Sequence, residues 1–408
     1  MYKCLSVIVL ILIVLNSCTL KKSISNMYSI KSNPEIEVIN IDSAEFCEKL
    51  YYSSYFDAPI VIALETSDAC IIRNIQSIDY YDNRLFILDD ESNALYVFAD
   101  DGSFIQRIGH RGNGHGEYVE ISDFSIDRKN NELYLWDEAL DMAHKYNIDT
   151  GHYISSIKTE RNGARSFCMQ YCNGHLYVNK TSIDDSKDQY LLKEIDVETG
   201  LQTASYLDAE HYNKGWNYPL RLPHSFFYAR NSASPKYIEL FSDTIISITE
   251  EGLIPSYVIK SRDILTNEDI CQFKKNQANP LDFNMEVLKK KGRVSQISQY
   301  ADFKEDVYLE FHKGADCFYL IYKKKNKKAV YSPSFVNDYI SKELNVPMNV
   351  CYSDDFGILA YIMPMHMPYF FEHFVKPKIL NVDNTRYEAL IHLKDDSNPV
   401  FFYHKFHE

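Results

Sequence analysis

Residues 95–109 read LYVFADDGSFIQRIG, and this stretch sets the fold expected for the whole chain. Two runs that alternate between apolar and polar residues flank an acidic turn that ends in Gly102. Alternation with a period of two is typical of a half-buried strand, and an Asp-Gly pair supplies the positive φ that a tight turn requires. The segment therefore predicts a β-hairpin.

The same hairpin pattern returns three times, with its glycines at Gly151, Gly200 and Gly252, at intervals of 49, 49 and 52 residues counted from Gly102. A second repeated run precedes each of the first three copies, at residues 82–89, 130–137 and 172–178. Weaker copies of that run stand at 235–240, 316–321 and 356–361.

A unit of about fifty residues with four short strands is typical of a propeller blade. One such unit cannot bury both of its faces, so the copies must stack around an axis into a single domain. The sequence therefore predicts an all-β protein, a six-bladed β-propeller. Helix formers near 266–293 and helical spacing near 332–345 predict short helical insertions in it.

The first residues have the features of a targeting signal. Lys3 is followed by an apolar run from Leu5 to Leu15, too short to span a bilayer comfortably, and then by Asn16-Ser17-Cys18. A small residue directly before a cysteine resembles the lipobox of bacterial lipoproteins. That resemblance implies a signal peptide over residues 1–17, a lipid on Cys18, and a tether over 18–35 that leads into the propeller at 36–408.

Composition limits the partners. The formal net charge is -14, and removal of residues 1–17 takes away Lys3 and gives -15. Because an acidic chain repels phosphate backbones, we expect no nucleic-acid partner. Of the nine cysteines, seven lie beyond Cys4 and Cys18. An odd number spread so widely predicts free thiols rather than a disulfide framework.

A glycine-rich decapeptide, GHRGNGHGEY at residues 109–118, has three possible roles. Phosphate binding would require a helix after the glycines, but residues 118–127 alternate with the period of a strand. A metal site from His110, His115 and Glu117 would have no fixed geometry in a flexible loop. The remaining interpretation, which we favour, is a crossing from one blade to the next, and we predict no metal and no cofactor.

Candidate ligand-binding residues follow from that interpretation. We expect the loop to lie at one end of the propeller near the mouth of the central channel, where loops on a rigid scaffold commonly bind ligands. Arg111, His115, Glu117 and Tyr118 are the candidates in the loop. Asp89 and Asp137, which end matching strands and could face the channel, are two more. We predict no catalytic residue, because no Gly-x-Ser-x-Gly and no His-Glu-x-x-His motif is present.

Several motifs together resemble one family, the six-bladed β-propeller lipoproteins of Bacteroides-type bacteria, which are similar to NHL-repeat propellers. They are the entry segment from Ile62 to Asp68, the hairpin around Asp101-Gly102, the run from Gly112 to Tyr118, and the tail from Asp395 to Val400. The family usually has proline where this chain has His115. The resemblance covers nearly the whole mature chain and implies a fold, but little about activity.

Three functional hypotheses remain, and the third is a sensor or assembly scaffold. The first is a non-catalytic lipoprotein of the bacterial cell envelope, anchored in the outer membrane through Cys18, that binds a glycan, a peptide or a partner protein. The second is a propeller enzyme, a lyase or hydrolase, whose His, Asp or Tyr side chains converge around the channel. The sequence leaves open which leaflet would carry the anchor.

Overall fold

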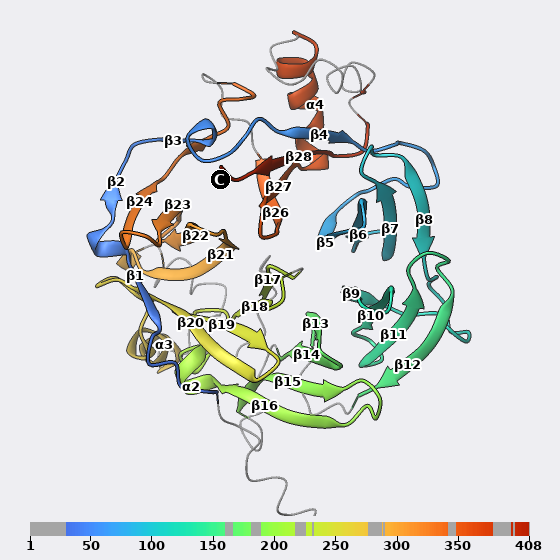
Figure 1. Cartoon of the computed structure of the whole chain (residues 1–408), viewed down its shortest axis with the longest axis horizontal. Helices are drawn as coiled ribbons and strands as arrows, with labels where there is room; N and C mark the ends of the chain where they lie inside the picture. Colours follow the sequence, from blue (N-terminus) through green and yellow to red (C-terminus); the bar gives the residue numbers. More distant parts are fainter. Residues whose placement is uncertain are drawn as a thin grey trace, which may run out of the picture.

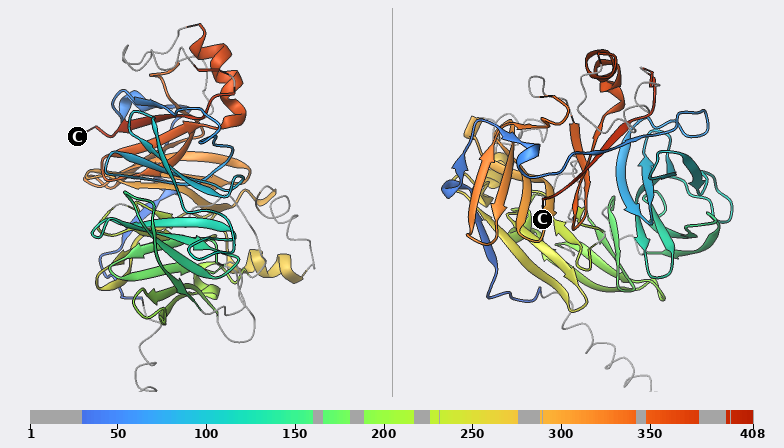
Figure 2. Two further views of the ribbon diagram at one scale, coloured as in Figure 1. Left: turned by 90° about the vertical axis from the view of Figure 1, so that its right-hand side faces the viewer. Right: turned by 45° about the horizontal axis from the view of Figure 1, so that its top comes forward.

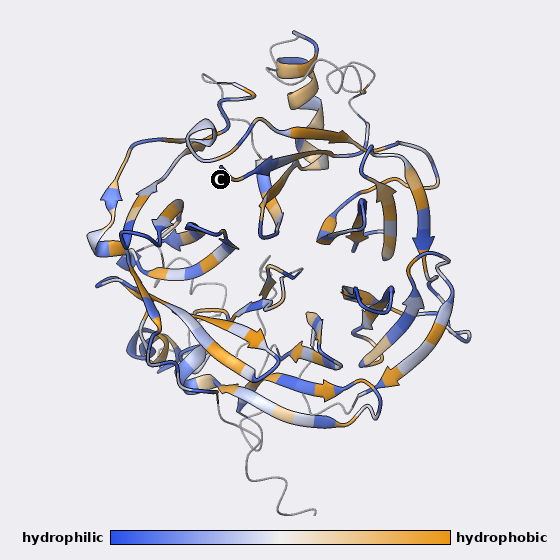
Figure 3. Cartoon of the chain, in the orientation of Figure 1, coloured by the Kyte–Doolittle hydropathy of each residue, from blue (hydrophilic) through white to orange (hydrophobic). Residues whose placement is uncertain are grey.

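The computed structural model describes residues 30–159, 166–180, 189–216, 226–230, 232–275, 288, 290–341, 348–377, 393–394 and 396–407. Within them, six sheets stand around a common axis as the blades of a propeller (Figure 1), which confirms the predicted fold class. Hydrophobic and hydrophilic residues alternate along many of the strands (Figure 3). Other strands are apolar on both faces, as in residues 94–98, which are all buried, so that a sheet packs against both of its neighbours.

Each blade has four antiparallel strands, numbered here from the axis outward. Blade one contains β5 (Ile75–Tyr81), β6 (Arg84–Asp89), β7 (Ala94–Ala99) and β8 (Phe104–Ile108). Blade two contains β9 (Ile121–Asp127), β10 (Glu132–Asp137), β11 (Met142–Asn147) and β12 (Tyr153–Lys158). Blade three contains β13 (Met169–Cys172), β14 (His175–Asn179), β15 (Tyr190–Asp196) and β16 (Gln202–Asp208). Blade four contains β17 (Phe227–Tyr228), β18 (Lys236–Ile238), β19 (Thr244–Thr249) and β20 (Gly252–Lys260). Blade five contains β21 (Val294–Asp302), β22 (Asp306–Lys313), β23 (Asp316–Lys323) and β24 (Lys328–Ser332).

Blade six closes the ring with strands from both ends of the chain. Its order is β26 (Met348–Ser353), β27 (Gly357–Ile362), β28 (Val400–Lys405) and β4 (Ile60–Ala63). The outermost strand, β4, comes from the N-terminal part and pairs antiparallel with β28, with Phe402 opposite Val61. Backbone hydrogen bonds within blade six thereby join the N-terminal strand that leads on to blade one to the C-terminal strands.

The repeated hairpins of the sequence are the two outer strands of the first four blades. Positive φ is found at Gly102, Gly151 and Gly200 in the turns between third and fourth strands, and at Gly252, the first residue of the fourth strand of blade four. One weaker copy differs from the prediction. The run at 316–321 lies in β23, the third strand of blade five rather than the second, because β21 and β22 both precede it.

An N-terminal belt, residues 37–63, runs around the outside of blades four, five and six (Figure 1). Its strands β1 (Glu37–Asn40) and β2 (Glu45–Phe46) add in parallel to β20 and β24. They cover two outer edges that would otherwise present unpaired backbone groups. β3 (Leu50–Tyr51) pairs in parallel with β25 (Phe335–Val336) before the belt becomes β4.

The belt also explains a wrong prediction. We expected a helix near 332–345, but residues 332–341 contain the end of β24, then β25 and a turn, and residues 342–347 lie outside the described part. Phe335 and Val336 pair with Leu50 and Tyr51, and the Phe335 ring packs against Tyr52 at 4.4 Å between ring centroids. Long-range pairing and burial outweigh local helical spacing here.

One helical insertion projects from one face of the ring, and another stands at the outer rim of blade six (Figure 1 and Figure 2). The insertion predicted near 266–293 contains α3 (Asn267–Lys275); residues 276–287 and 289 are not described. α4 (Met367–Phe370) and a following π-helical turn (Phe371–Val375) stand between β27 and β28. Their buried Phe370 and Phe374 pack against Val61 and Phe402 of blade six and belong to its core. We call the side of the ring with the blade-to-blade connections the crossover face. The opposite side, with the turns between first and second strands and between third and fourth strands, is the turn face.

A buried arginine ties the innermost strands together. Arg230 lies two residues after the end of β17, and its guanidinium makes two hydrogen bonds to the Asp123 carboxylate of β9, at 3.0 and 3.1 Å. It also donates to Gln170 Oε1 of β13 at 3.0 Å. Ser77 of β5 donates to Asp123 as well, at 3.1 Å. Blades one to four are thus connected through a single carboxylate near the axis.

Breaking this pair should destabilise the fold. We expect Arg230→Met to lower the free energy of unfolding by about 3–5 kcal/mol, because it leaves the Asp123 carboxylate buried without its cation. Arg230→Met combined with Asp123→Asn should recover much of that loss, since the introduced amide would be neutral and would keep an acceptor oxygen. Urea unfolding measures both.

The matched control is Arg73→Met. Arg73 and Glu91 form a pair in which both side chains are largely exposed, and such pairs contribute about 0–1 kcal/mol. Equal losses for Arg73→Met and Arg230→Met would contradict the role assigned to Arg230.

Candidate functional site

The glycine-rich loop at residues 109–118 is a blade crossing, as predicted. It leads from β8, the outermost strand of blade one, to β9, the innermost strand of blade two. Arg111 and Tyr118 form an isolated parallel bridge, in which Gly112 N–H donates to the Tyr118 carbonyl at 2.8 Å. The strand that follows the glycines leaves no helix N-terminus for a phosphate.

Two of its glycines allow close approach to blade two. Gly109 and Gly116 have φ of +71° and +76°. A Cβ on Gly116 would lie 2.6 Å from Cγ of Tyr153, and one on Gly109 would lie 2.9 Å from the Tyr146 hydroxyl oxygen. Only glycine satisfies both the backbone conformation and this spacing.

The loop does not lie where we expected. Tyr146 of β11 donates a hydrogen bond to the Gly116 carbonyl at 2.8 Å, and the His115 ring packs edge-on against Tyr153 of β12, with centroids 4.8 Å apart. These are the two outer strands of blade two. Contacts with these tyrosines therefore hold the loop at the outer part of the blade rather than at the mouth of the channel.

The four candidates in the loop are not brought together as a site. Tyr118 is buried, and its hydroxyl donates to the Asn93 carbonyl at 3.0 Å. The Glu117 carboxylate accepts the Gly114 N–H at 2.7 Å, so it holds the turn itself. Arg111 and His115 are exposed.

Asp89 and Asp137 have a structural role instead of a position in the channel. Both are fully buried at the ends of second strands. Asp89 accepts the N–H groups of Arg73 and Asn74, just before β5, at 2.8 and 3.2 Å. Asp137 accepts those of Val119 and Glu120, just before β9, at 2.6 and 3.4 Å.

In the third blade, an amide side chain accepts the corresponding backbone N–H groups. Asn179 Oδ1 accepts the N–H groups of Phe167 and Cys168, just before β13, at 3.0 and 2.8 Å. Each of these side chains fixes the point where the chain enters the innermost strand of its blade. Asp89 and Asp137 are therefore occupied by backbone donors and are not available to a ligand.

Cys18, the predicted lipidation site, lies outside the described residues, as does the whole of 1–29. The seven cysteines of the described part are free thiols, as predicted. No helix in the described part of the chain is long and apolar enough to cross a membrane.

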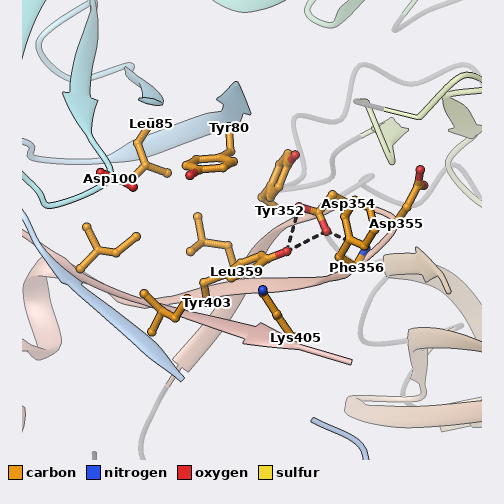
Figure 4. Close-up of a pocket in the computed structure, with 12 residues that line it drawn as sticks. Tyr80, Leu85, Asp100, Tyr352, Asp354, Asp355, Phe356, Leu359, Tyr403 and Lys405 are labelled. Atoms are coloured by element: carbon orange, nitrogen blue, oxygen red, sulfur yellow. Dashed lines mark hydrogen bonds between the residues drawn. The ribbon is translucent and has the colours of Figure 1, made fainter. Parts of the chain in front are cut away.

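A cavity lies between blade six and blade one. We call it the closure crevice, because β4 and β28, the strands that close the ring, form part of its wall (Figure 4). Its volume is about 430 Å³. Aliphatic side chains form one part of the lining: Ile60, Ile62, Leu85 and Leu359. Aromatic side chains form a second part: Tyr80, Tyr352, Phe356 and Tyr403.

Four charged side chains complete the lining of the closure crevice: Asp100, Asp354, Asp355 and Lys405. Asp100 belongs to the β7–β8 turn, whereas Asp354 and Asp355 belong to the β26–β27 turn. The crevice is therefore on the turn face, opposite the crossover face. In Figure 4, Asp100 lies beside Leu85 at one side, and the two other carboxylates lie at the far side.

The β26–β27 turn is rigid because Asp354 organises it. Its carboxylate accepts the N–H groups of Phe356 and Gly357, both at 2.8 Å, and the Tyr403 hydroxyl at 3.0 Å. A Cβ on Gly357 would lie 2.2 Å from the His404 carbonyl oxygen, so glycine is required there. This turn leaves the Phe356 side chain 71% exposed at the rim of the crevice.

Burial controls the ionisation of the polar groups in the crevice. It raises the pKa of Asp354, and the hydrogen bonds from Phe356 N–H and Tyr403 oppose that rise. Burial together with nearby carboxylates raises the pKa of Tyr80, Tyr352 and Tyr403. The three phenols therefore stay protonated at neutral pH and can donate hydrogen bonds.

A second, more polar cavity of about 310 Å³ lies on the same face between blades five and six. Its lining includes Tyr55, Glu305, Lys323 and His407. The Lys323 ammonium is already paired with the Asp306 carboxylate at 2.8 Å. This cavity has fewer aromatic walls and is the weaker candidate.

The sequence did not point to the closure crevice. Nothing in the sequence links Asp354-Asp355 to Tyr80, Leu85 or Asp100. The one available signal was an apolar ring, Phe356, inside an acidic turn. Ring closure brings these segments together, and no local pattern encodes that neighbourhood.

Fold and site together define a six-bladed β-propeller with a cavity at the junction that closes the ring. The chain belongs to the DUF4934 family, a domain of unknown function, whose profile matches residues 36–405. No protein with a curated description matches the chain.

Among solved structures, the chain is similar to a Bacteroides fragilis protein described as a "putative exported protein". The two share 18% identity with a TM-score of 0.70, over 91% of this chain and 100% of that one. A member of the DUF4221 family from Bacteroides vulgatus matches at 9% identity and a TM-score of 0.49, over 86% and 97% of the two chains. At 18% identity the likeness to the Bacteroides fragilis protein concerns the fold alone.

The close approach at Gly116 can be tested. We expect Gly116→Ala to lower the free energy of unfolding by about 1–2 kcal/mol from the positive φ and by a further 1–3 kcal/mol from the clash with Tyr153. Urea unfolding measures the change.

The control for this test is Gly174→Ala, because Gly174 also has positive φ, +81°, but nothing lies within 4 Å of its Cβ position. It should show only the smaller, conformational loss. If the two variants lose equal stability, packing on Tyr153 does not select glycine at position 116.

Proposed function

We propose that this chain is an exported, non-catalytic binding protein whose ligand site is the closure crevice. The observation that carries the proposal is a cavity of about 430 Å³ with apolar and aromatic walls and a few polar groups. Ligand sites in proteins commonly have 300–1,000 Å³ and this kind of lining.

The closure crevice has a rigid frame. β4 and β28 hold one wall through four residue pairs, from Val400 opposite Ala63 to Tyr403 opposite Ile60. The other wall is β5 and β6 of blade one, whose Leu85 is fully buried. A site formed in advance loses little conformational freedom on binding, which favours affinity.

The environment of the protein is part of the proposal. The lipobox-like Asn16-Ser17-Cys18 supports export and a lipid anchor at Cys18 in a bacterial envelope, with the outer membrane as the proposed site. The "putative exported protein" of similar fold from Bacteroides fragilis is consistent with export. The ligand can be a free small molecule or part of a glycan, peptide or envelope protein.

Ligand capture tests whether the closure crevice is the binding site. The purified chain is incubated with a small-molecule extract of the cells that produce it, and bound compounds are identified by mass spectrometry after denaturation. We expect Phe356→Ala to weaken binding roughly tenfold, because it removes an aromatic ring at the rim.

Leu201→Ala is the matched control, because Leu201 is also exposed (62%) but lies between β15 and β16 in blade three. It should bind as the unchanged chain does. Capture that is equal for all three proteins would show that the crevice is not the site.

The anchor is tested separately. We expect Cys18→Ala to abolish lipid attachment and to release the chain from the membrane fraction, because the thiol that would carry the lipid is gone. Cys4→Ala changes a cysteine inside the predicted signal peptide and should leave attachment intact. A mature N-terminus other than residue 18, found by mass spectrometry, would refute the lipoprotein assignment.

A further inference from the structure

We infer that the closure crevice binds a small organic cation, an apolar body that carries an alkylammonium group, with the ammonium at the Asp100 side. This inference rests on the proposed function, since it names the chemical class of the ligand for the same cavity. The support comes from the charges, the aromatic rings and the position of one lysine.

The lining of the crevice is acidic. Asp100, Asp354 and Asp355 face a single cation, Lys405, which gives a formal charge of -2. The whole chain is also acidic, at -14. A cleft of one sign with low-dielectric walls concentrates ligands of the opposite sign.

The carboxylates differ in their availability. Asp354 is occupied by the β26–β27 turn and by Tyr403. In the described part of the chain, the Asp100 side chain has no hydrogen bond or ion pair that would compete with a ligand, whereas Asp355 interacts electrostatically with Lys236. In Figure 4, Asp100 lies beside Leu85 and Tyr80, whereas Asp355 points away from Tyr403. Asp100 is therefore the better placed of the two.

The aromatic walls suit a cation at this side. Tyr80 directs its hydroxyl end toward Asp100 in Figure 4, and the carboxylates of Asp100 and Asp354 both raise the pKa of the Tyr80 phenol. Ring faces attract ammonium groups, and the attraction grows when water is excluded. A carboxylate and a tyrosine ring together can hold an ammonium that neither would hold alone.

The rest of the lining selects an apolar body. Ile60, Ile62 and Leu359 present aliphatic surface to the cavity. A metal ion or a free ammonium ion would leave that surface exposed to water, whereas a hydrocarbon body would cover it. The volume matches a small molecule rather than a folded partner.

Lys405 sets the orientation of the ligand. Its ammonium lies near Tyr403, across the crevice from Asp100 (Figure 4). On that side the Asp354 carboxylate is already hydrogen-bonded and Asp355 points away, so the Lys405 ammonium disfavours a ligand cation there, whereas Asp100 attracts one at the opposite side. An anionic ligand would meet the reverse arrangement, with one cation against three carboxylates.

The test uses three probes with one body and different charges: phenylbutylamine, phenylbutanol and phenylbutanoate. Their dissociation constants for the full chain are measured by calorimetry at low salt. We expect the amine to bind about tenfold more tightly than the alcohol, a difference of about 1.4 kcal/mol, and the carboxylate to bind most weakly. Because exposed charges are screened, the preference should shrink at high salt.

Asp100→Asn should reduce the preference for amine over alcohol to within about twofold, because the charge that distinguishes them is gone. Asp68→Asn is the control: it changes the net charge equally, but Asp68 is exposed in the β4–β5 connection on the crossover face. Lys405→Met should strengthen binding of the amine.

The outcomes separate this inference from the proposed function. Alcohol or carboxylate binding as tightly as the amine, or equal effects of Asp100→Asn and Asp68→Asn, overturns the cation assignment and leaves the crevice as a binding site. If none of the three probes binds while extract compounds still bind in a Phe356-dependent way, the cation assignment is also overturned and the crevice remains a binding site. Failure of the probes together with Phe356-independent capture overturns both.

Discussion

The pairing of β4 with β28 is the constraint on which the rest of the structure depends. A propeller blade has two apolar faces, so every blade needs a neighbour on both sides, and a ring satisfies this only when it is closed. Here backbone hydrogen bonds between strands from opposite ends of the chain make the closure. The same pairing forms a wall of the closure crevice, because Ile60 and Ile62 come from β4 and Tyr403 and Lys405 from β28.

Polar side chains support the ring at two radii. Near the axis, the Asp123 carboxylate and the Arg230 guanidinium connect innermost strands, and the cost of burying both charges is offset by their mutual hydrogen bonds. Further out, Asp89, Asp137 and Asn179 receive the backbone N–H groups that precede the innermost strands. These are conspicuous polar residues, yet their contacts are internal. This is why acidic residues at strand ends were poor guides to a binding site.

The candidate site is found instead at a junction. The loop at 109–118 has the composition of a binding loop, but Tyr146 and Tyr153 hold it against the outer part of blade two. The closure crevice combines an aromatic and aliphatic lining with carboxylates, on the turn face. The candidate site of this protein is thus defined by the shape of an interblade junction rather than by a loop rich in glycine and histidine.

The sequence alone determined the repeat, the glycine turns at Gly102 and Gly151, and the crossing at 109–118. These depend on strand periodicity and on backbone conformations open only to certain residues, which are local properties. Tertiary structure alone decided that Phe335 and Val336 form a strand against the belt, that Ile60 lies opposite Tyr403, and that Tyr80 and Asp354 line one cavity. Each of these depends on pairing and packing between residues far apart in the chain, which become neighbours only when the last blade meets the first.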